Sequence, residues 1–289
     1  MIYLLFSVLA ATLIFVVFKL FERFNINILQ AITANYIVAF FTGIIAYGQV
    51  ASISQMVRYE WFYYSVLLGI LFIVVFVLMA ITTQKGGLSV VSIATKMSMV
   101  IPILFGLFYY KEDASVLKII GILLALIAVY FSSLKAKSNI SIDKKYIIYP
   151  ILVFIGSGIV DTSIKFLEDS FVAKDDVPLF SATIFFSAAI VGALIIVYKA
   201  INGTVKIELK NWFAGIFLGI PNYFSVYFLV QALRSEGLES SEVFTLNNVA
   251  VVMLSTILGI LLFKEKLIPK NWFGILLAIT SILLIFFSK

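Results

Sequence analysis

Apolar residues run along the chain in ten long blocks, separated by short stretches that hold most of the charges and turn residues. The blocks are about 18 to 24 residues long, the length of an α-helix that crosses a hydrocarbon layer of about 30 Å. The pattern therefore predicts an all-α integral membrane protein with ten transmembrane helices. The predicted spans are 2–21, 28–48, 61–84, 87–110, 115–134, 146–168, 178–201, 212–234, 238–263 and 271–288.

The composition agrees with this prediction and excludes several kinds of chemistry. Hydrophobic residues make up 63% of the chain and charged residues 12%, against about 45–50% and about 25% in soluble domains. The chain has no cysteine and no histidine, which excludes thiolate nucleophiles, imidazole bases and the usual zinc sites. The net charge of +6 comes from cations that flank the apolar blocks and anchor them at the membrane surface. We therefore expect the lipid bilayer as a partner, and no enzyme activity, cofactor, metal ion or nucleic acid.

The two halves of the sequence resemble each other. The string GILLA occurs at 121–125 and at 274–278, and LLGI at 67–70 matches FLGI at 217–220. The longest and most polar connection, 135–145, lies near the middle of the chain. Because each half holds five spans, an odd number, the second half must enter the membrane from the opposite side; in transporters such inverted repeats place the binding site near the midplane. The predicted repeats are residues 1–138 and 139–289.

The ends of the fourth and ninth spans carry a loose motif: a glycine, bulky apolar residues, a Lys-Glu turn and a last span that contains GILLA. The strings are GLFYYKED and GILLFKEKL. In this motif and in the five-plus-five repeat, nearly the whole chain resembles the drug/metabolite transporter superfamily in its EamA-like ten-span branch. Many relatives carry an arginine early in the second span, where this chain has LQAITANY at 29–36, so no role of that arginine is carried over. The resemblance implies a central cavity lined by spans 1, 3, 4, 6, 8 and 9.

Lys96 is the most informative single residue. It lies about nine residues into the fourth span, roughly 13 Å deep, where a lysine costs about 2.5 to 3.5 kcal/mol and should face water or a partner. Its functional interpretation is attraction of an anionic or zwitterionic substrate, and the alternative is a buried structural ion pair. The polar and small residues on the same face of a predicted helix are Ser89, Ser92, Thr95, Met99 and Gly106, of which Ser92, Thr95 and Met99 join Lys96 as candidate binding residues.

Asp161, in the sixth span, is the expected counter-charge of Lys96. A local pair with Lys165 at i,i+4 is the simpler alternative and contributes only a few tenths of a kcal/mol. Because the chain lacks histidine, proton coupling would require Asp161 or Glu242.

The eighth and ninth spans supply the other candidate residues. Pro221 removes one backbone hydrogen bond and is predicted to break the eighth span, where the candidates are Asn222, Tyr223 and Tyr227. Buried amides need partners, so the polar start of the ninth span serves either substrate binding or helix packing. Its candidates are Glu242, Thr245, Asn247 and Asn248.

The functional prediction is a secondary transporter that exports small polar metabolites such as amino acids by alternating access about a midplane site near Lys96. Alternatives are an exchanger of anionic sugar phosphates or nucleotide sugars, a cationic-drug exporter, and a lipid-scramblase or structural role. The resemblance implies a bacterial inner membrane and cytoplasmic termini, whereas lysine and arginine counts would place both termini outside. We follow the resemblance. Small residues in spans five and ten predict a packing face or a homodimer contact.

Overall fold

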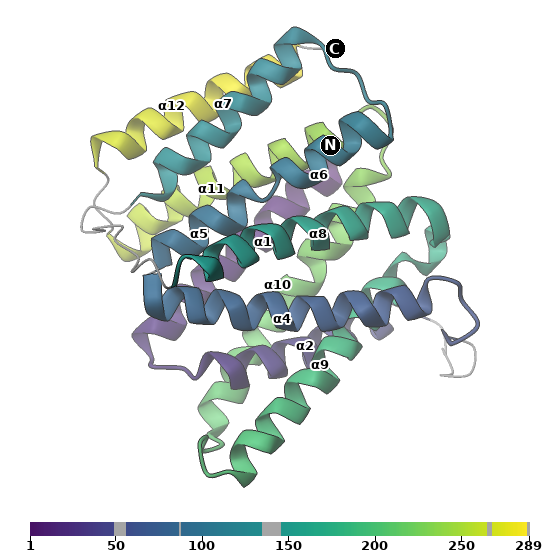
Figure 1. Cartoon of the computed structure of the whole chain (residues 1–289), viewed down its shortest axis with the longest axis vertical. Helices are drawn as coiled ribbons and strands as arrows, with labels where there is room; N and C mark the ends of the chain where they lie inside the picture. The colour runs from purple at the N-terminus through teal and green to yellow at the C-terminus, as the bar shows by residue number, and fades with distance from the viewer. Residues whose placement is uncertain (49–55, 87, 135–145, 265–267, 288–289) are drawn as a thin grey trace. The chain divides into compact units, whose positions relative to one another are not determined.

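The computed structural model describes residues 1–48, 56–86, 88–134, 146–264 and 268–287, and every regular element within these ranges is a helix (Figure 1). In chain order the helices are α1 (Ile2–Arg23), α2 (Ile28–Tyr47), α4 (Phe62–Gly86), α5 (Leu88–Met97), α6 (Val100–Tyr109), α7 (Val116–Ser133), α8 (Ile148–Phe171), the short η2 (Lys174–Asp176), α9 (Val177–Ile201), α10 (Leu209–Leu233), α11 (Ser240–Phe263) and α12 (Pro269–Phe286).

Each predicted span except the fourth corresponds to one helix, and the predicted ends agree with the observed ends within three residues. Eight of the described helices are long and apolar enough to cross a membrane, and Ile93–Tyr109 and Val116–Ser132 are shorter apolar stretches. Large apolar side chains such as Phe108 are highly exposed, at 80% in that case. An apolar surface of this kind suits contact with lipid, so the prediction of a ten-helix membrane protein is confirmed.

Backbone contacts divide the chain into two compact units. The first combines Met1–Val77 with Ser163–Arg234, and the second combines Leu78–Thr162 with Ser235–Lys289. Each unit therefore contains segments from both halves of the sequence. The two predicted repeats stay a prediction, and the connection at 135–145 that separates them lies outside the described residues.

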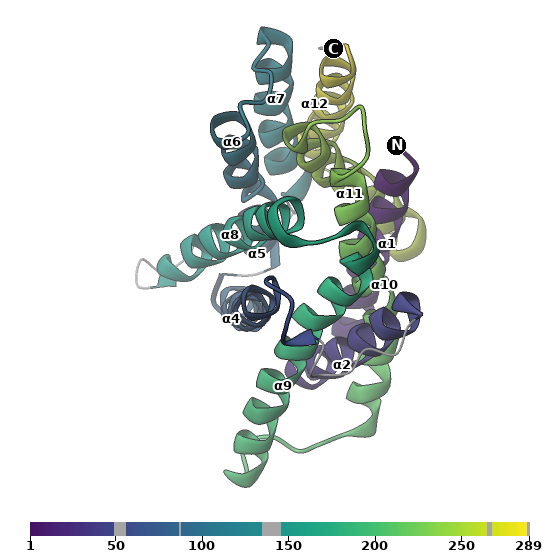
Figure 2. The same cartoon turned by 90° about the vertical axis from the view of Figure 1, so that its right-hand side faces the viewer.

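In the first unit, α2 packs against α9 and α10, and α1 packs against α10 (Figures 1 and 2). Gly69 of α4 and Gly219 of α10 occupy matching sequence positions, and each lies so close to a neighbouring helix that an added Cβ would clash. The residues that these two glycines contact also occupy matching positions, because the contacts of Gly69 lie 149 residues after those of Gly219. The neighbours are Ile184 and Ser187 on α9 for Gly69, and Asn35 and Val38 on α2 for Gly219.

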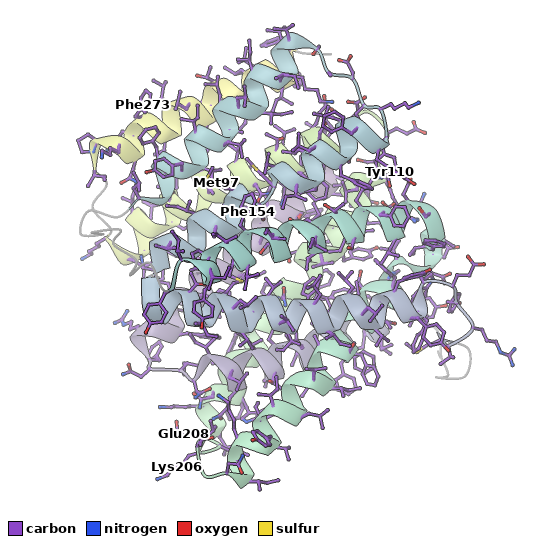
Figure 3. All side chains as sticks on the ribbon, in the orientation of Figure 1. Met97, Tyr110, Phe154, Lys206, Glu208 and Phe273 are labelled. Carbon is purple, nitrogen blue, oxygen red and sulfur yellow. The ribbon has the colours of Figure 1, made fainter. Side chains whose placement is uncertain are left out.

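The connection between α9 and α10 is held by an amide of α2. Gln30 donates its Nε2 to the carbonyl of Lys206 at 2.7 Å, and its Oε1 accepts from the backbone of Glu208 at 3.1 Å and from Asn211 Nδ2 at 3.2 Å. Lys206 and Glu208 are labelled in Figure 3. The oxygen and the nitrogen of the Gln30 amide are thus both hydrogen-bonded, and they satisfy backbone groups of the connection between α9 and α10.

In the second unit, α7 lies beside α12 (Figures 1 and 2). The small residues predicted in spans five and ten make this contact inside the chain, and a homodimer through the same spans stays a prediction. Gly121 lies against Ile285, and Gly274 lies against Ser132. The two glycines are 153 residues apart in the sequence, and so are their two partners. Ser281 Oγ also donates to the carbonyl of Gly121 at 2.7 Å.

The predicted break in the eighth span is wrong. Pro221 lies inside α10, which continues as one helix from Leu209 to Leu233. Membrane helices tolerate an internal proline where neighbouring helices support the backbone, and α10 has such support from α1, α2 and α9.

Candidate functional site

The fourth span is divided into two helices, α5 and α6, at Ser98–Met99, just before Pro102, which the sequence marks as a second proline inside a span. Pro102 has no N–H, so the carbonyl of Ser98 cannot receive the usual i→i+4 bond. It accepts instead from the N–H of Ile101 at 3.0 Å, one residue early. Near the end of α5, the carbonyl of Thr95 accepts from Ser98 Oγ at 2.6 Å, and that of Lys96 accepts from the N–H of Met99 at 3.5 Å, again in place of the regular i→i+4 bonds.

Lys96 lies in the last turn of α5, where a cation is favoured by the helix dipole. Its Nζ donates to Asn248 Oδ1 of α11 at 3.3 Å. The amide nitrogen of Asn248 donates to the carbonyl of Phe244 at 3.0 Å, which fixes the orientation of the amide and turns its oxygen toward the lysine.

Asp161 of α8 and Lys96 interact electrostatically, and both side chains are partly buried. The counter-charge role predicted for Asp161 stays a prediction. The alternative partner of Asp161, Lys165, has its Nζ 3.4 Å from Glu168 and 3.6 Å from Asp169. The cation on α5 is thus hydrogen-bonded to an amide of α11 and interacts electrostatically with a carboxylate of α8.

A glycine brings α8 close to the break. A Cβ added to Gly158 would clash with Ile101, the residue whose N–H bonds to Ser98. Five residues earlier on α8, Val153 packs with Ala94 of α5, and Phe154 adds to this cluster (Figure 3). Close packing on both sides of the break holds α8, and with it Asp161, beside Lys96.

The other candidates of the second unit are less directly involved. Thr95 donates back to the carbonyl of Val91 at 2.8 Å, and Met99 is fully buried. Thr245 is buried and donates to the carbonyl of Ser241 at 2.7 Å. The side chain of Ser92 lies outside the described residues.

Two further polar residues of α11 differ in their partners. Asn247 is buried, and its Oδ1 has no hydrogen-bond partner among the described residues; an acceptor in this state favours a donor from outside the chain. Glu242 is also buried, but its carboxylate accepts from the N–H of Glu239 at 3.0 Å as part of a capping box.

Asn222, Tyr223 and Tyr227 belong to the first unit. The rings of Tyr223 and Tyr227 stack with centroids 5.9 Å apart. Tyr223 is fully buried, and its hydroxyl has no hydrogen-bond partner among the described residues, whereas Tyr227 accepts from Gln231 Nε2 at 3.3 Å. Tyr223 therefore offers an unused polar atom of its own.

Comparison with known proteins decides the family. The sequence model of the EamA-like transporter family matches residues 144–287, the second half of the chain. The chain belongs to the EamA-like transporter family. This EamA-like protein is 28% identical to an uncharacterized protein of Haemophilus influenzae (strain ATCC 51907 / DSM 11121 / KW20 / Rd), over 98% of this chain and 97% of the relative. The predicted resemblance to the drug/metabolite transporter superfamily is thereby confirmed.

A crystal structure of another protein shares the fold of this EamA-like chain. The TM-score is 0.77, with 14% sequence identity and coverage of 99% of both chains. Membership of the family indicates a membrane transporter, and the family is one of transporters and not of enzymes. Among the described residues, no group of three or more acidic, histidine or cysteine side chains could hold a metal ion.

Sequence reasoning about this EamA-like transporter missed the contact between Lys96 and Asn248 and the role of Gly158. Helix-face patterns place residues on one helix but do not pair faces of different helices. A signal for the break was present, because Pro102 follows Lys96 by six residues. The assembled group has one cation, one carboxylate and amide oxygens.

Proposed function

We propose that this EamA-like protein is a secondary transporter that exports small polar metabolites, amino acids among them, across a bacterial inner membrane. The observation that carries the proposal is the Lys96 ammonium at a helix break, bonded to Asn248 and facing the charge of Asp161. A cation and a carboxylate this deep in spans are costly and mark a site for a charged solute.

The chemistry of the group matches a zwitterion. The Lys96 ammonium and the Asn248 amide suit a carboxylate, while Asp161 and the unpartnered Asn247 Oδ1 suit an α-ammonium group. A bound amino acid would replace the internal pairing of Lys96 with charges of the substrate, so neither buried ion is left without compensation.

Alternating access is supported by the matching contacts of the two halves. Gly69 and Gly219 have matching neighbours, and so do Gly121 and Gly274. Matching contacts of this kind arise when two copies of one unit are related by a two-fold axis, as in transporters with inverted repeats. Two such repeats that rock against each other would expose the Lys96 site to each side of the membrane in turn.

The two rival substrates fit the group less well. A sugar phosphate carries two negative charges and usually attracts several cations, whereas this group has one lysine and an opposing carboxylate. A cationic drug would meet the Lys96 ammonium and be repelled by it. The rivals are therefore kept as outcomes of the experiment.

Counterflow in liposomes tests the proposal. Purified protein is reconstituted, the vesicles are loaded with unlabelled neutral L-amino acids, and a labelled trace of each is added outside, with protein-free vesicles as control. We expect saturable, transient accumulation of at least one amino acid. If no amino acid accumulates, the proposed substrate class is wrong, and accumulation of a sugar phosphate or a quaternary ammonium cation instead would support a rival.

A further inference from the structure

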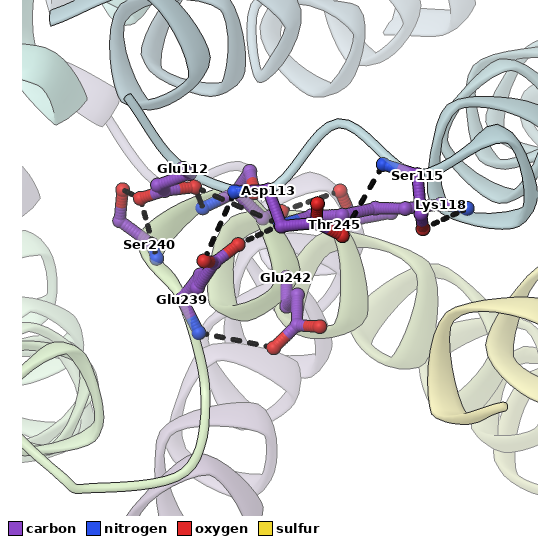
Figure 4. Close-up of polar contacts among 9 residues, drawn as sticks. Glu112, Asp113, Ser115, Lys118, Glu239, Ser240, Glu242 and Thr245 are labelled. Atoms are coloured by element: carbon purple, nitrogen blue, oxygen red, sulfur yellow. Dashed lines mark hydrogen bonds and ion pairs between the residues drawn. The ribbon is translucent and has the colours of Figure 1, made fainter. Parts of the chain in front are cut away.

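The N-terminus of α11 is held entirely by carboxylates (Figure 4). The first four N–H groups of a helix have no partner within the helix. Here Ser240 N and Ser241 N donate to the two oxygens of Glu112 at 2.9 and 3.0 Å. Glu239 N donates to Glu242 at 3.0 Å, and the side chain of Glu239 accepts from the N–H of Glu242. All four N–H groups therefore have charged acceptors, which also suit the positive end of the helix dipole.

Glu112 reaches α11 from the turn that follows α6. Lys111, the residue before it, has a φ of 53°, a left-handed conformation that directs the chain sharply toward α11. Gly106 lies beneath the carboxylate, because a Cβ there would come within 2.8 Å of Ser240 Oγ and 3.0 Å of Glu112. Ser240 Oγ also donates to Glu112. Only 8% of the Glu112 side chain is exposed, so its bonds to α11 are shielded from competing water.

A buried cation balances this group. Lys118 of α7 is ion-paired with Glu239, and its Nζ lies 4.0 Å from Glu112. The backbone of Asp113 adds a bond to Glu239 at 3.1 Å. The Lys118 side chain is only 2% exposed, and a buried cation of this kind lowers the cost of the two carboxylates. The cluster thus ties the ends of α6, α7 and α11 together.

The same helix carries Asn248, seven residues beyond Ser241 and about 10 Å along the axis. Because the chain is broken at Ser98–Met99, α6 does not rigidly extend α5, and the partner of Lys96 must be placed in another way. We propose that Glu112 is a positioning residue for the Lys96 site. Its grip on two successive amides sets both the height and the rotation of α11, so that Asn248 Oδ1 meets Lys96 Nζ. This inference rests on the proposed transport function for its activity readout.

The substitution Glu112→Gln tests it, because glutamine keeps the size of the side chain but can accept from only one of the two amides. The probe is the neutral L-amino acid with the strongest counterflow in the native protein. We expect KM to rise about tenfold, equivalent to about 1.4 kcal/mol, with the maximal rate changed less than twofold. Glu236→Gln, at an exposed glutamate just before α11, is the matched control and should keep the native KM.

A double-mutant cycle separates positioning from general destabilisation. If Glu112 acts through Asn248, the effect of Glu112→Gln on KM should vanish in an Asn248→Ala background. Additive effects would overturn the proposal. Should Glu112→Gln fail to fold, Ser240→Ala removes only the hydroxyl donor to the carboxylate and should raise KM less, again only when Asn248 is present.

A distance measurement needs no substrate and therefore fails independently of the proposed function. The chain has no native cysteine, so spin labels on cysteines at Leu123 of α7 and Leu261 of α11, both exposed, report the register of α11 cleanly. Glu112→Gln should shift or broaden the distance between these labels. An unchanged, narrow distance would overturn the positioning role even if transport of amino acids is found.

Discussion

The fourth and ninth membrane segments occupy matching places in the two halves of the chain, yet they are built differently. Both end at a lysine with left-handed backbone, Lys111 at φ 53° and Lys264 at φ 54°. The fourth segment is broken at Ser98–Met99, whereas the ninth is one helix from Ser240 to Phe263. The two segments thus share the way they end and differ in the middle.

The difference teaches how one pattern yields two complementary parts. Lys96 matches Leu246 in the repeat, so only the broken segment carries the buried cation. The similar strings of the two halves are offset by 150 residues before the break and by 153 after it. Pro102, which causes the break, therefore matches Val252 or Ser255, and both have the N–H that a continuous helix needs. The continuous helix supplies the amide partner Asn248 and is fixed by capping. The broken segment therefore carries the charge, and the continuous segment carries its amide partner.

The largest expected effect comes from removing the cation. Lys96→Met should abolish amino-acid counterflow while the protein stays folded, because methionine fills the space but cannot bind a carboxylate. Lys118→Met is the contrasting variant: it leaves Glu112 and Glu239 without their buried partner, which should cost about 3–5 kcal/mol of stability. Thermal unfolding in detergent and counterflow are measured together. Unfolding of Lys96→Met at as low a temperature as Lys118→Met would show that Lys96 is a structural ion-pair member.

A second, smaller effect separates the two candidate proton carriers. Asp161 interacts electrostatically with Lys96, whereas Glu242 caps the helix on which it lies. We predict that a pH gradient accelerates uptake by the native protein and that Asp161→Asn removes this acceleration. Glu242→Gln should keep that acceleration and lose about 1 kcal/mol of stability, the usual cost of a damaged cap. Uptake by Asp161→Asn that still responds fully to the gradient would exclude Asp161 as the carrier.

The helices were predictable, and the site only in part. Long apolar blocks determine spans whatever their neighbours are, which is why the ends agree closely. Lys96 and Asp161 could be singled out because a charge deep in a span is costly wherever it lies. The Lys96–Asn248 bond could not be predicted, since it depends on the packing of α11 against α5. The role of Glu242 had only a weak local signal, because the residue at the N-cap is Glu239 and not the serine or threonine of the usual capping box.

The two prolines show the limit of local rules most clearly, and they give the smallest expected effect. Pro221 lies in a continuous helix that three neighbours support, while Pro102 follows a break that its missing N–H explains. Pro102→Ala restores a donor for the Ser98 carbonyl, so it should stiffen the α5–α6 junction, protect the Ile101 amide from hydrogen exchange and slow counterflow.

Pro221→Ala is the matched control for this change. It should raise the unfolding temperature, because a proline inside a helix costs up to about 3 kcal/mol, and it should leave the transport rate near its native value. If the break serves transport, only Pro102→Ala slows counterflow. Equal slowing by both substitutions would mean that both prolines affect transport through general helix flexibility. The break in the fourth segment would then have no specific role in transport.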